Sequence, residues 1–224
     1  MSSKRLDEET RLILKRVIES IAWRQIASMN MLGHCLKLVV DLQTKLRVAN
    51  ELDVGIRLFN EVAGLYDELG WEEIETVVRD RIEDLPYPAS RVEFGLAYYL
   101  TGLAEMSAMQ SYTDCSEEQF AAIACSYVDA STGRPDPTRF IEFCKDPGNR
   151  PQAQTYVNRW LPIALFSLGR PGSKGEQEIT ARGLRSKTSA ELQSDFLAKV
   201  QPFLESCGVQ LPDLKELGVE LGVE

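Results

Sequence analysis

The chain has 224 residues, of which 44% are hydrophobic and 26% charged, and its formal net charge is −9 at pH 7. These proportions are typical of a globular chain and exclude a disordered or fibrous one. The acidic balance, without a lysine- or arginine-rich run, argues against nucleic acid as a partner, and no apolar run is long enough to span a bilayer. Residues 1–8 are polar and show no signal region. We therefore expect a cytoplasmic single domain, with no membrane or nucleic-acid partner.

Apolar residues recur at three- and four-residue steps along most of the chain, which is the period of a helix with one buried face. The pattern predicts two long antiparallel helices over 7–32 and 36–69. No segment shows the alternation of a strand, so the predicted fold is an all-α helical bundle with additional C-terminal helices. The further helices are expected over 71–85, 90–112, 116–130, 138–145, 152–168 and 189–207.

Cap and turn residues set the boundaries of these segments. Ser116 and Gln119 have the spacing of a capping box, and Pro162 is expected to kink or restart its helix. Residues 169–183, rich in glycine, serine and charge, predict a mobile loop, and residues 208–224 a polar tail able to wrap a neighbour. The expected organisation is a single domain over 1–224, with the bundle over about 7–168, the loop over 169–183, and a C-terminal helix and tail over 184–224.

Short motifs occur in a fixed order in the C-terminal third and once upstream. They read N-R-W-L-P over 158–162, F-S-L-G-R-P over 166–171, S-A-E-L-Q-S-D-F over 189–196, G-V-Q-L-P-D-L over 208–214, and R-V-A-N-E-L-D-V-G-I-R-L-F over 47–59. This set resembles the catalytic subunit of the phenylacetyl-CoA epoxidase family, the phenylacetic acid catabolic proteins. The resemblance implies a ferritin-like bundle with a di-iron site, working in a multicomponent oxygenase complex.

The resemblance also assigns positions to the iron ligands on the first two bundle helices. A di-iron carboxylate site needs a carboxylate from each of two helices and a Glu-x-x-His from each of the other two. On the first helix the glutamate position is Gln25, a neutral amide and a poor iron ligand. On the second helix Glu51 is kept, but the histidine position is Val54.

The third and fourth helices depart from the ligand pattern as well. The third-helix ligand falls near Thr101 or Gly102, with Glu105 one turn on. The fourth helix, matched to residues 140–154, places the Glu-x-x-His at Pro147 and Arg150. We therefore predict no catalytic residue, no metal and no cofactor. The positions of the vestigial site are Gln25, Glu51, Val54, Glu105, Pro147 and Arg150.

Buried carboxylates without a metal need another counter-charge. Glu51 and Glu105 share apolar helix stripes, so we hypothesise that Arg150 reaches one of them and replaces the metal electrostatically. His34, the only histidine, lies near the turn between the first two helices and is predicted to be a surface or capping residue. The five cysteines are irregularly spaced, which predicts reduced thiols.

Two functions follow from the resemblance. The first is a non-catalytic, ferritin-like subunit or paralogue of a CoA-thioester oxygenase, a pseudoenzyme with a degenerate di-iron site. It would form a homodimer or join a related helical oxygenase subunit, and the apolar positions over 163–168 fit such an interface. The second is an active oxidoreductase with a relocated metal held by residues such as Glu51, Glu105, Asp53 or His34.

A third function is an acyl or CoA-thioester binding module, with a pocket lined by residues such as Tyr98, Phe94 and Met106. A basic stretch over 37–47 could contact a CoA phosphate, although it also reads as ordinary surface charge. The glycines over 169–175 lack the Gly-Lys-Ser/Thr order of a P-loop, so no phosphate loop is expected there.

Overall fold

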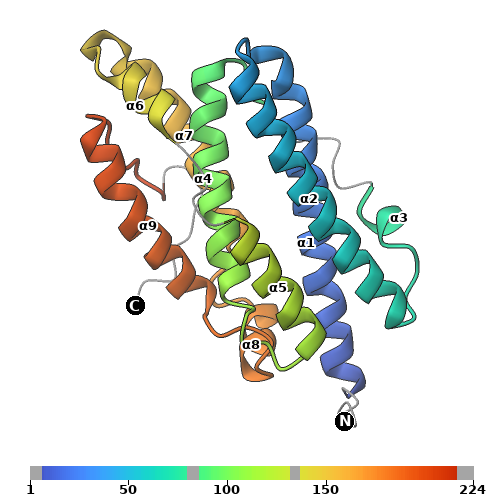
Figure 1. Cartoon of the computed structure of the whole chain (residues 1–224). Helices are drawn as coiled ribbons and strands as arrows, with labels where there is room; N and C mark the ends of the chain where they lie inside the picture. Colours follow the sequence, from blue (N-terminus) through green and yellow to red (C-terminus); the bar gives the residue numbers. More distant parts are fainter. Residues whose placement is uncertain (1–6, 80–85, 132–136, 216–224) are drawn as a thin grey trace.

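The computed structural model describes residues 7–79, 86–131 and 137–215. In these ranges the regular elements are all helical, which confirms the predicted all-α helical bundle with additional C-terminal helices (Figure 1). None of the described helices is long and apolar enough to cross a membrane. The elements are α1 (Glu8–Cys35), the 3₁₀ turn η1 (Leu36–Leu38), α2 (Leu42–Glu68), α3 (Ile74–Arg79), α4 (Arg91–Gln110), α5 (Glu118–Ala130), α6 (Thr138–Cys144), the 3₁₀ turn η2 (Pro147–Asn149), α7 (Arg150–Ser167), α8 (Lys174–Ala181) and α9 (Ser189–Ser206).

The long helices α1 and α2 form an antiparallel hairpin and make the most extensive contact between described elements. Each begins at an aspartate cap. The Asp7 carboxylate accepts a hydrogen bond from the Thr10 amide at 2.8 Å, and Asp41 accepts one from the Thr44 amide at 2.8 Å. These bonds satisfy amides that have no partner inside the first turn, so both helix starts are fixed by local sequence.

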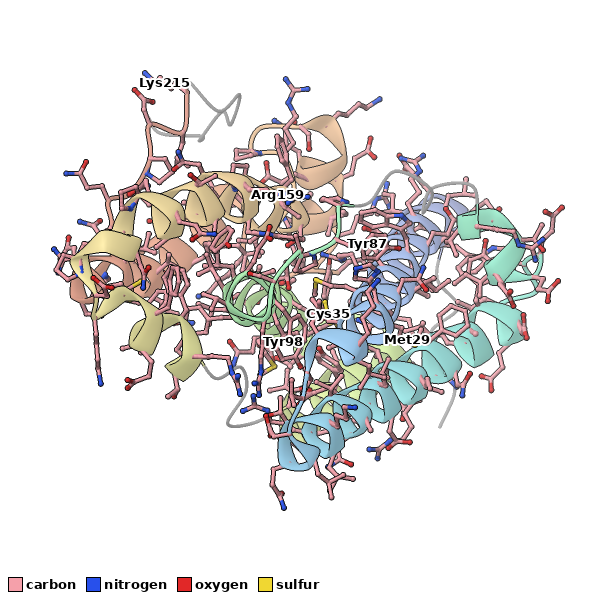
Figure 2. The ribbon with its side chains drawn as sticks, turned by 90° about the horizontal axis from the view of Figure 1, so that it is seen from above. Met29, Cys35, Tyr87, Tyr98, Arg159 and Lys215 are labelled. Carbon is pink, nitrogen blue, oxygen red and sulfur yellow. The ribbon has the colours of Figure 1, made fainter. Side chains whose placement is uncertain are left out.

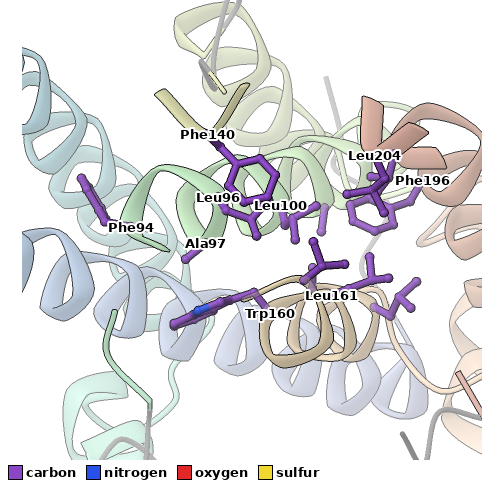
Figure 3. Packing of buried hydrophobic residues seen from close by; sticks show 14 of the residues in the cluster. Phe94, Leu96, Ala97, Leu100, Phe140, Trp160, Leu161, Phe196 and Leu204 are labelled. Carbon is purple, nitrogen blue, oxygen red and sulfur yellow. The ribbon is translucent and has the colours of Figure 1, made fainter. Parts of the chain in front are cut away.

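The helix α4 lies at the centre of the molecule, with α7 on one side and α5 on another (Figure 1). Figure 3 shows its leucines meeting aromatic side chains from α6, α7 and α9. A helix enclosed in this way must be apolar on several faces, and α4 is accordingly poor in charge. The labelled members of this cluster are Phe94, Leu96, Ala97, Leu100, Phe140, Trp160, Leu161, Phe196 and Leu204.

A second apolar cluster joins the first half of α1 to the second half of α2, to α3 and to α5. Tyr66 and Phe120 are fully buried in it. The Tyr66 hydroxyl donates to Glu19 Oε1 at 2.7 Å, so the one carboxylate that α1 buries here has a hydrogen-bond donor. The hairpin is therefore held by apolar packing and by a buried polar contact between its two helices.

The predicted cap of one helix is wrong, and at Pro162 the predicted restart does not occur, whereas the predicted kink stays a prediction. The cap of α5 is Glu117, whose carboxylate accepts from the Phe120 amide at 2.6 Å, and not Ser116 with Gln119. The helix α7 continues through Pro162 without a break. Pro162 leaves only the carbonyl four residues earlier without its amide donor, and that residue is exposed, so water can satisfy the carbonyl.

The segment 169–183, expected to be a mobile loop, contains the helix α8. Ser173 caps this helix by accepting from the Glu176 amide at 3.3 Å. The first part of the predicted tail lies on its own chain, because Gln210 exchanges backbone hydrogen bonds of 2.8 and 2.9 Å with the Gln154 side chain on α7. In the predicted helix over 71–85, α3 covers Ile74–Arg79, and residues 80–85 lie outside the described ranges.

Candidate functional site

Four helices, α1, α2, α4 and α5, enclose a small polar cavity with a volume of about 30 Å³. Its polar walls are Gln25 from α1, Glu51 from α2, Glu105 from α4 and Tyr127 from α5. A volume of this size holds one or two water molecules. The cavity is therefore a polar interruption of the bundle interior and has no room for a substrate.

Glu105 and Tyr127, both in this cavity, have raised pKa values. The Gln25 side-chain amide donates to Glu105 Oε1, and the Tyr127 hydroxyl is a second donor. Burial raises the pKa of the Glu105 carboxyl, and Glu51 adds to the rise, whereas Tyr127, Arg24 and Gln25 lower it. Burial and the nearby Glu105 also raise the pKa of Tyr127 well above its usual value. The net effect is a carboxyl that holds its proton more tightly than one in water.

Glu51 is held from the neighbouring helix. The Tyr98 hydroxyl on α4 donates to Glu51 Oε2 at 2.6 Å, and Glu51 is only 8% exposed. In the view of Figure 2, Tyr98 and Arg159 lie on different sides of α4. One turn after Glu51, a Cβ atom on Gly55 would lie 3.2 Å from Met29 Cγ, so the glycine lets α2 close against α1 beside the cavity.

The structure brings together the predicted vestigial positions on α1, α2 and α4 but not those near α7. Arg150 is exposed and packs against Gly208 after α9, where an added Cβ would come within 2.7 Å of Arg150 Nε. Pro147 is exposed in η2. The hypothesis that Arg150 neutralises a bundle carboxylate is therefore wrong, because Arg150 is exposed and its guanidinium lies against Gly208. The predicted positions that line the cavity are Gln25, Glu51, Val54 and Glu105.

The fourth wall of the cavity is α5, which sequence reasoning did not assign to the site. It contributes Tyr127 and, just beyond the helix, Ser131. A signal was present, because Phe120, Ala124 and Tyr127 recur at helical spacing and the first two are fully buried. Tyr127 extends this stripe towards α4 and places a hydroxyl in the bundle interior.

The residues of the polar cavity do not fit a di-iron centre. Among its described lining residues, Glu51 and Glu105 are the only carboxylates, and Tyr98 and Gln25 already donate to them. Over the described ranges as a whole, no group of three or more His, Cys, Asp or Glu side chains is placed to hold a metal ion. Two iron ions need about six such ligands, so the two carboxylates of this cavity are too few to hold a di-iron centre.

A second cavity, with a volume of about 270 Å³, adjoins the polar one. Its walls are mainly aromatic and aliphatic, and they come from α1, from α7 and from the segment before α4. Ser28, Thr101 and Glu105 line both cavities, so the Glu105 carboxyl lies where the apolar cavity meets the polar one. The apolar lining residues are Trp23, Ala27, Met31, Pro86, Tyr87, Trp160, Ile163 and Phe166.

This apolar cavity differs from the pocket expected from the sequence. Tyr98 and Met106 line the small polar cavity, and Phe94 is packed in the core with 6% exposure. His34 stacks on Tyr87 with ring centroids 4.7 Å apart, so it supports the wall of the apolar cavity from α1. The prediction of a pocket was made on the wrong face of α4, because helical spacing alone does not tell which neighbour covers a face.

No model of a known protein family matches the chain, and no curated protein matches its sequence at a significant level. The relation to the epoxidase family therefore rests on the sequence motifs alone and stays a prediction.

Proposed function

We propose that this protein is a non-catalytic helical-bundle protein that binds a small apolar molecule in the cavity between α1, α4 and α7. The observation that carries the proposal is the cavity of about 270 Å³ with apolar walls and a single carboxyl, Glu105, where it meets the polar cavity. Small-molecule sites in proteins have this composition, in which apolar walls supply affinity and a few polar groups fix the orientation.

The volume sets the size of the ligand. A dry cavity of roughly 150 Å³ takes benzene. A volume of about 270 Å³ therefore has room for one substituted ring or for a chain of roughly six to eight carbons. The flat side chains of Trp23, Tyr87 and Trp160 suit a planar or flexible apolar ligand, because they offer large contact areas with little conformational freedom.

Glu105 gives the ligand a polar contact. Because burial raises its pKa, the carboxyl can be protonated at higher pH than usual and can then donate a hydrogen bond as well as accept one. A ligand hydroxyl or carbonyl fits this role. Gln25 holds the other side of the carboxyl, so Glu105 is oriented before a ligand arrives.

The proposal combines the first and the third function expected from the sequence: a non-catalytic relative of an oxygenase subunit that binds a ligand. Gln25 and Val54 stand where the resemblance would place iron ligands, and neither can hold iron. We infer a binding component, related to an oxygenase subunit, whose bundle interior has kept a ligand cavity while losing the metal ligands. A second copy or a related helical subunit would be its partner.

Thermal unfolding and calorimetry with 4-ethylphenol and hexan-1-ol test this function. A ligand of the folded state at a concentration of 100 times its Kd stabilises by about 2.7 kcal/mol, so we expect a clear rise in Tm with either compound. Ala27→Leu, which fills the cavity from α1, should abolish the rise.

The matched control is Ala122→Leu, which adds the same atoms to the exposed face of α5 and should bind like the wild type. The proposal fails if neither compound stabilises the wild type, or if both stabilise Ala27→Leu as strongly as Ala122→Leu.

A further inference from the structure

A third cavity, with a volume of about 250 Å³, lies between α1, the end of α7, α8 and the start of α9. Its charged lining consists of four arginines and one glutamate. This excess of positive charge stands out in a chain whose net charge is −9. The arginines are Arg16, Arg24, Arg170 and Arg185, and the glutamate is Glu176.

Arg185 is the most buried of these arginines, and one of its hydrogen-bond donors is unused. Arg185 is 6% exposed, and its Nη2 donates to Ser189 Oγ at 3.1 Å and lies 3.6 Å from Glu176 Oε1. Its Nε is buried and has no hydrogen-bond partner among the described residues. A buried donor without a partner is unfavourable, so Arg185 keeps unused hydrogen-bonding capacity beside the cavity.

Glu176 offsets one of these positive charges, and Glu178 lies 3.9 Å from Arg16. The two Glu176 oxygens accept from the backbone amides of Gly172, at 2.5 Å, and of Ser189. The carboxylate therefore ties the loop before α8 to the start of α9, and it faces Arg185 only at the longer distance of 3.6 Å. Glu176 therefore builds the wall and pairs with Arg185, and the cavity lining still has more arginines than carboxylates.

Arg24 connects this cavity to the apolar one. Both Arg24 and Ser167 line the two cavities, and Arg24 Nη1 donates to the Ser167 carbonyl at 2.5 Å. Arg24 also lies close enough to Glu105 to lower its pKa. A ligand in the apolar cavity can therefore extend past Arg24 and Ser167 towards the other arginines.

We propose that the two cavities form one site for an amphipathic anion, with the apolar body beside Trp23 and Trp160 and one phosphate or carboxylate head held by Arg24 and Arg185. The inference rests on the proposed function, because the apolar body occupies the cavity described there. Guanidinium groups suit such a head group because their planar donors pair with two of its oxygens at once.

The arginine site does not depend on a phosphate loop. The glycine-containing turn over 169–175 forms part of the rim, and Gly169 and Gly172 adopt positive φ values of 97° and 69°. These glycines shape the turn that carries Arg170, whose side chain is exposed at the cavity. Recognition comes from arginine side chains, which is consistent with the missing P-loop order.

Calorimetry with three probes that share one alkyl chain tests the inference: hexan-1-ol, hexanoate and hexyl phosphate. We expect at least one of the two anions to bind the wild type about 10-fold or more tightly than the alcohol, a preference that weakens as salt is added. The better anion identifies the head group. Equal affinity for all three probes would overturn the inference but leave the proposed function standing, whereas binding of none would overturn both.

Variants locate the head group. Arg24→Gln should reduce the preference for the anion to about 3-fold or less. Arg170→Gln should also reduce this preference. Because Arg170 is exposed at the rim, its replacement is expected to disturb folding less than that of Arg24. The matched control is Arg57→Gln on the exposed side of α2, where the side chain pairs with Asp53 at 2.8 Å. An unchanged preference in both cavity variants, equal to that of Arg57→Gln, would contradict the assignment.

Discussion

The glutamine at position 25 suits a bundle interior without metal. A carboxylate there would face Glu105 and Glu51 in the same small cavity, and three negative charges would repel one another. The amide instead donates to Glu105, which turns a repulsive contact into a hydrogen bond. The amide at this position thus explains how the neighbouring carboxyl stays inside the bundle.

The cysteines lead to a prediction at the same scale. Cys125 is exposed and the other four are buried. Burial raises the pKa of Cys35 and Cys144 to about 12, and the thiolate is the reactive form. Iodoacetamide at about pH 8 should therefore modify one thiol of the folded protein quickly and the rest only on unfolding, as counted by intact mass. Cys125→Ser should remove the fast reaction; a fast reaction that persists in this variant would contradict the burial of the others.

Among the elements, the junction of α4 and α7 depends on one carboxylate. Glu93 is 2% exposed, and its Oε1 accepts from Trp160 Nε1 and Arg159 Nη1, each at 2.9 Å. Its Oε2 accepts from the Ala89 amide at 2.8 Å, which completes the start of α4. Glu93→Ala would leave the buried Trp160 donor and the Ala89 amide without an acceptor, so we expect a loss of about 2–4 kcal/mol in the free energy of unfolding, measured in urea.

Arg159→Ala is the control for this junction. The Arg159 side chain is 44% exposed, so water can replace its contact with Glu93 and the loss should stay within about 1 kcal/mol. A Glu93→Ala loss no larger than that of Arg159→Ala would show that the carboxylate does not join the two helices.

The sequence predicts that the long helices exist, but it does not predict which other elements pack against them. The spacing of Leu14, Val17 and Ile18 follows from the helix period itself, and all three are buried as expected. The helix α8 was missed because glycine and charge dominate its surroundings, although Ser173 and Glu176 have the spacing of a helix start. The local sequence therefore predicts α1 and also contains a signal for α8. The signal for α8 is the weaker of the two, and the glycine and charge around it favoured a loop instead.

At the scale of the whole molecule, the cavities arise from residues that are far apart in the sequence. Arg24 and Arg185 line one cavity because α1 packs beside α8, and Glu105 on α4 lines both the polar and the apolar cavity. No spacing rule within one helix encodes such a meeting. The sequence could show that Gln25 and Glu51 belong to one bundle interior, yet only packing could place Tyr127 opposite them.

The pH dependence of stability combines groups that are shifted in opposite directions. Hydrogen bonds from threonine side chains and backbone amides at helix starts lower the pKa of Asp7, Asp41 and Glu191 below their usual values. Their contribution is present above about pH 4 and is lost as the pH falls through their folded pKa values. Glu105 has the opposite sign: burial raises its pKa, so its contribution is present below its unfolded pKa of about 4.5 and is lost as the pH rises through the folded value.

We therefore expect the free energy of unfolding to peak in the weakly acidic range and to decline towards neutral pH because of Glu105. Glu105→Gln should flatten this decline above about pH 4.5, the unfolded pKa of the carboxyl, and leave the acid limb unchanged, since the helix caps still titrate there. Glu61→Gln, on the exposed face of α2, removes one carboxylate without entering the cavity and should keep the wild-type slope. Urea unfolding across this range measures all three chains. Equal slopes in the wild type and in Glu105→Gln would mean that Glu105 titrates as it does in the unfolded chain.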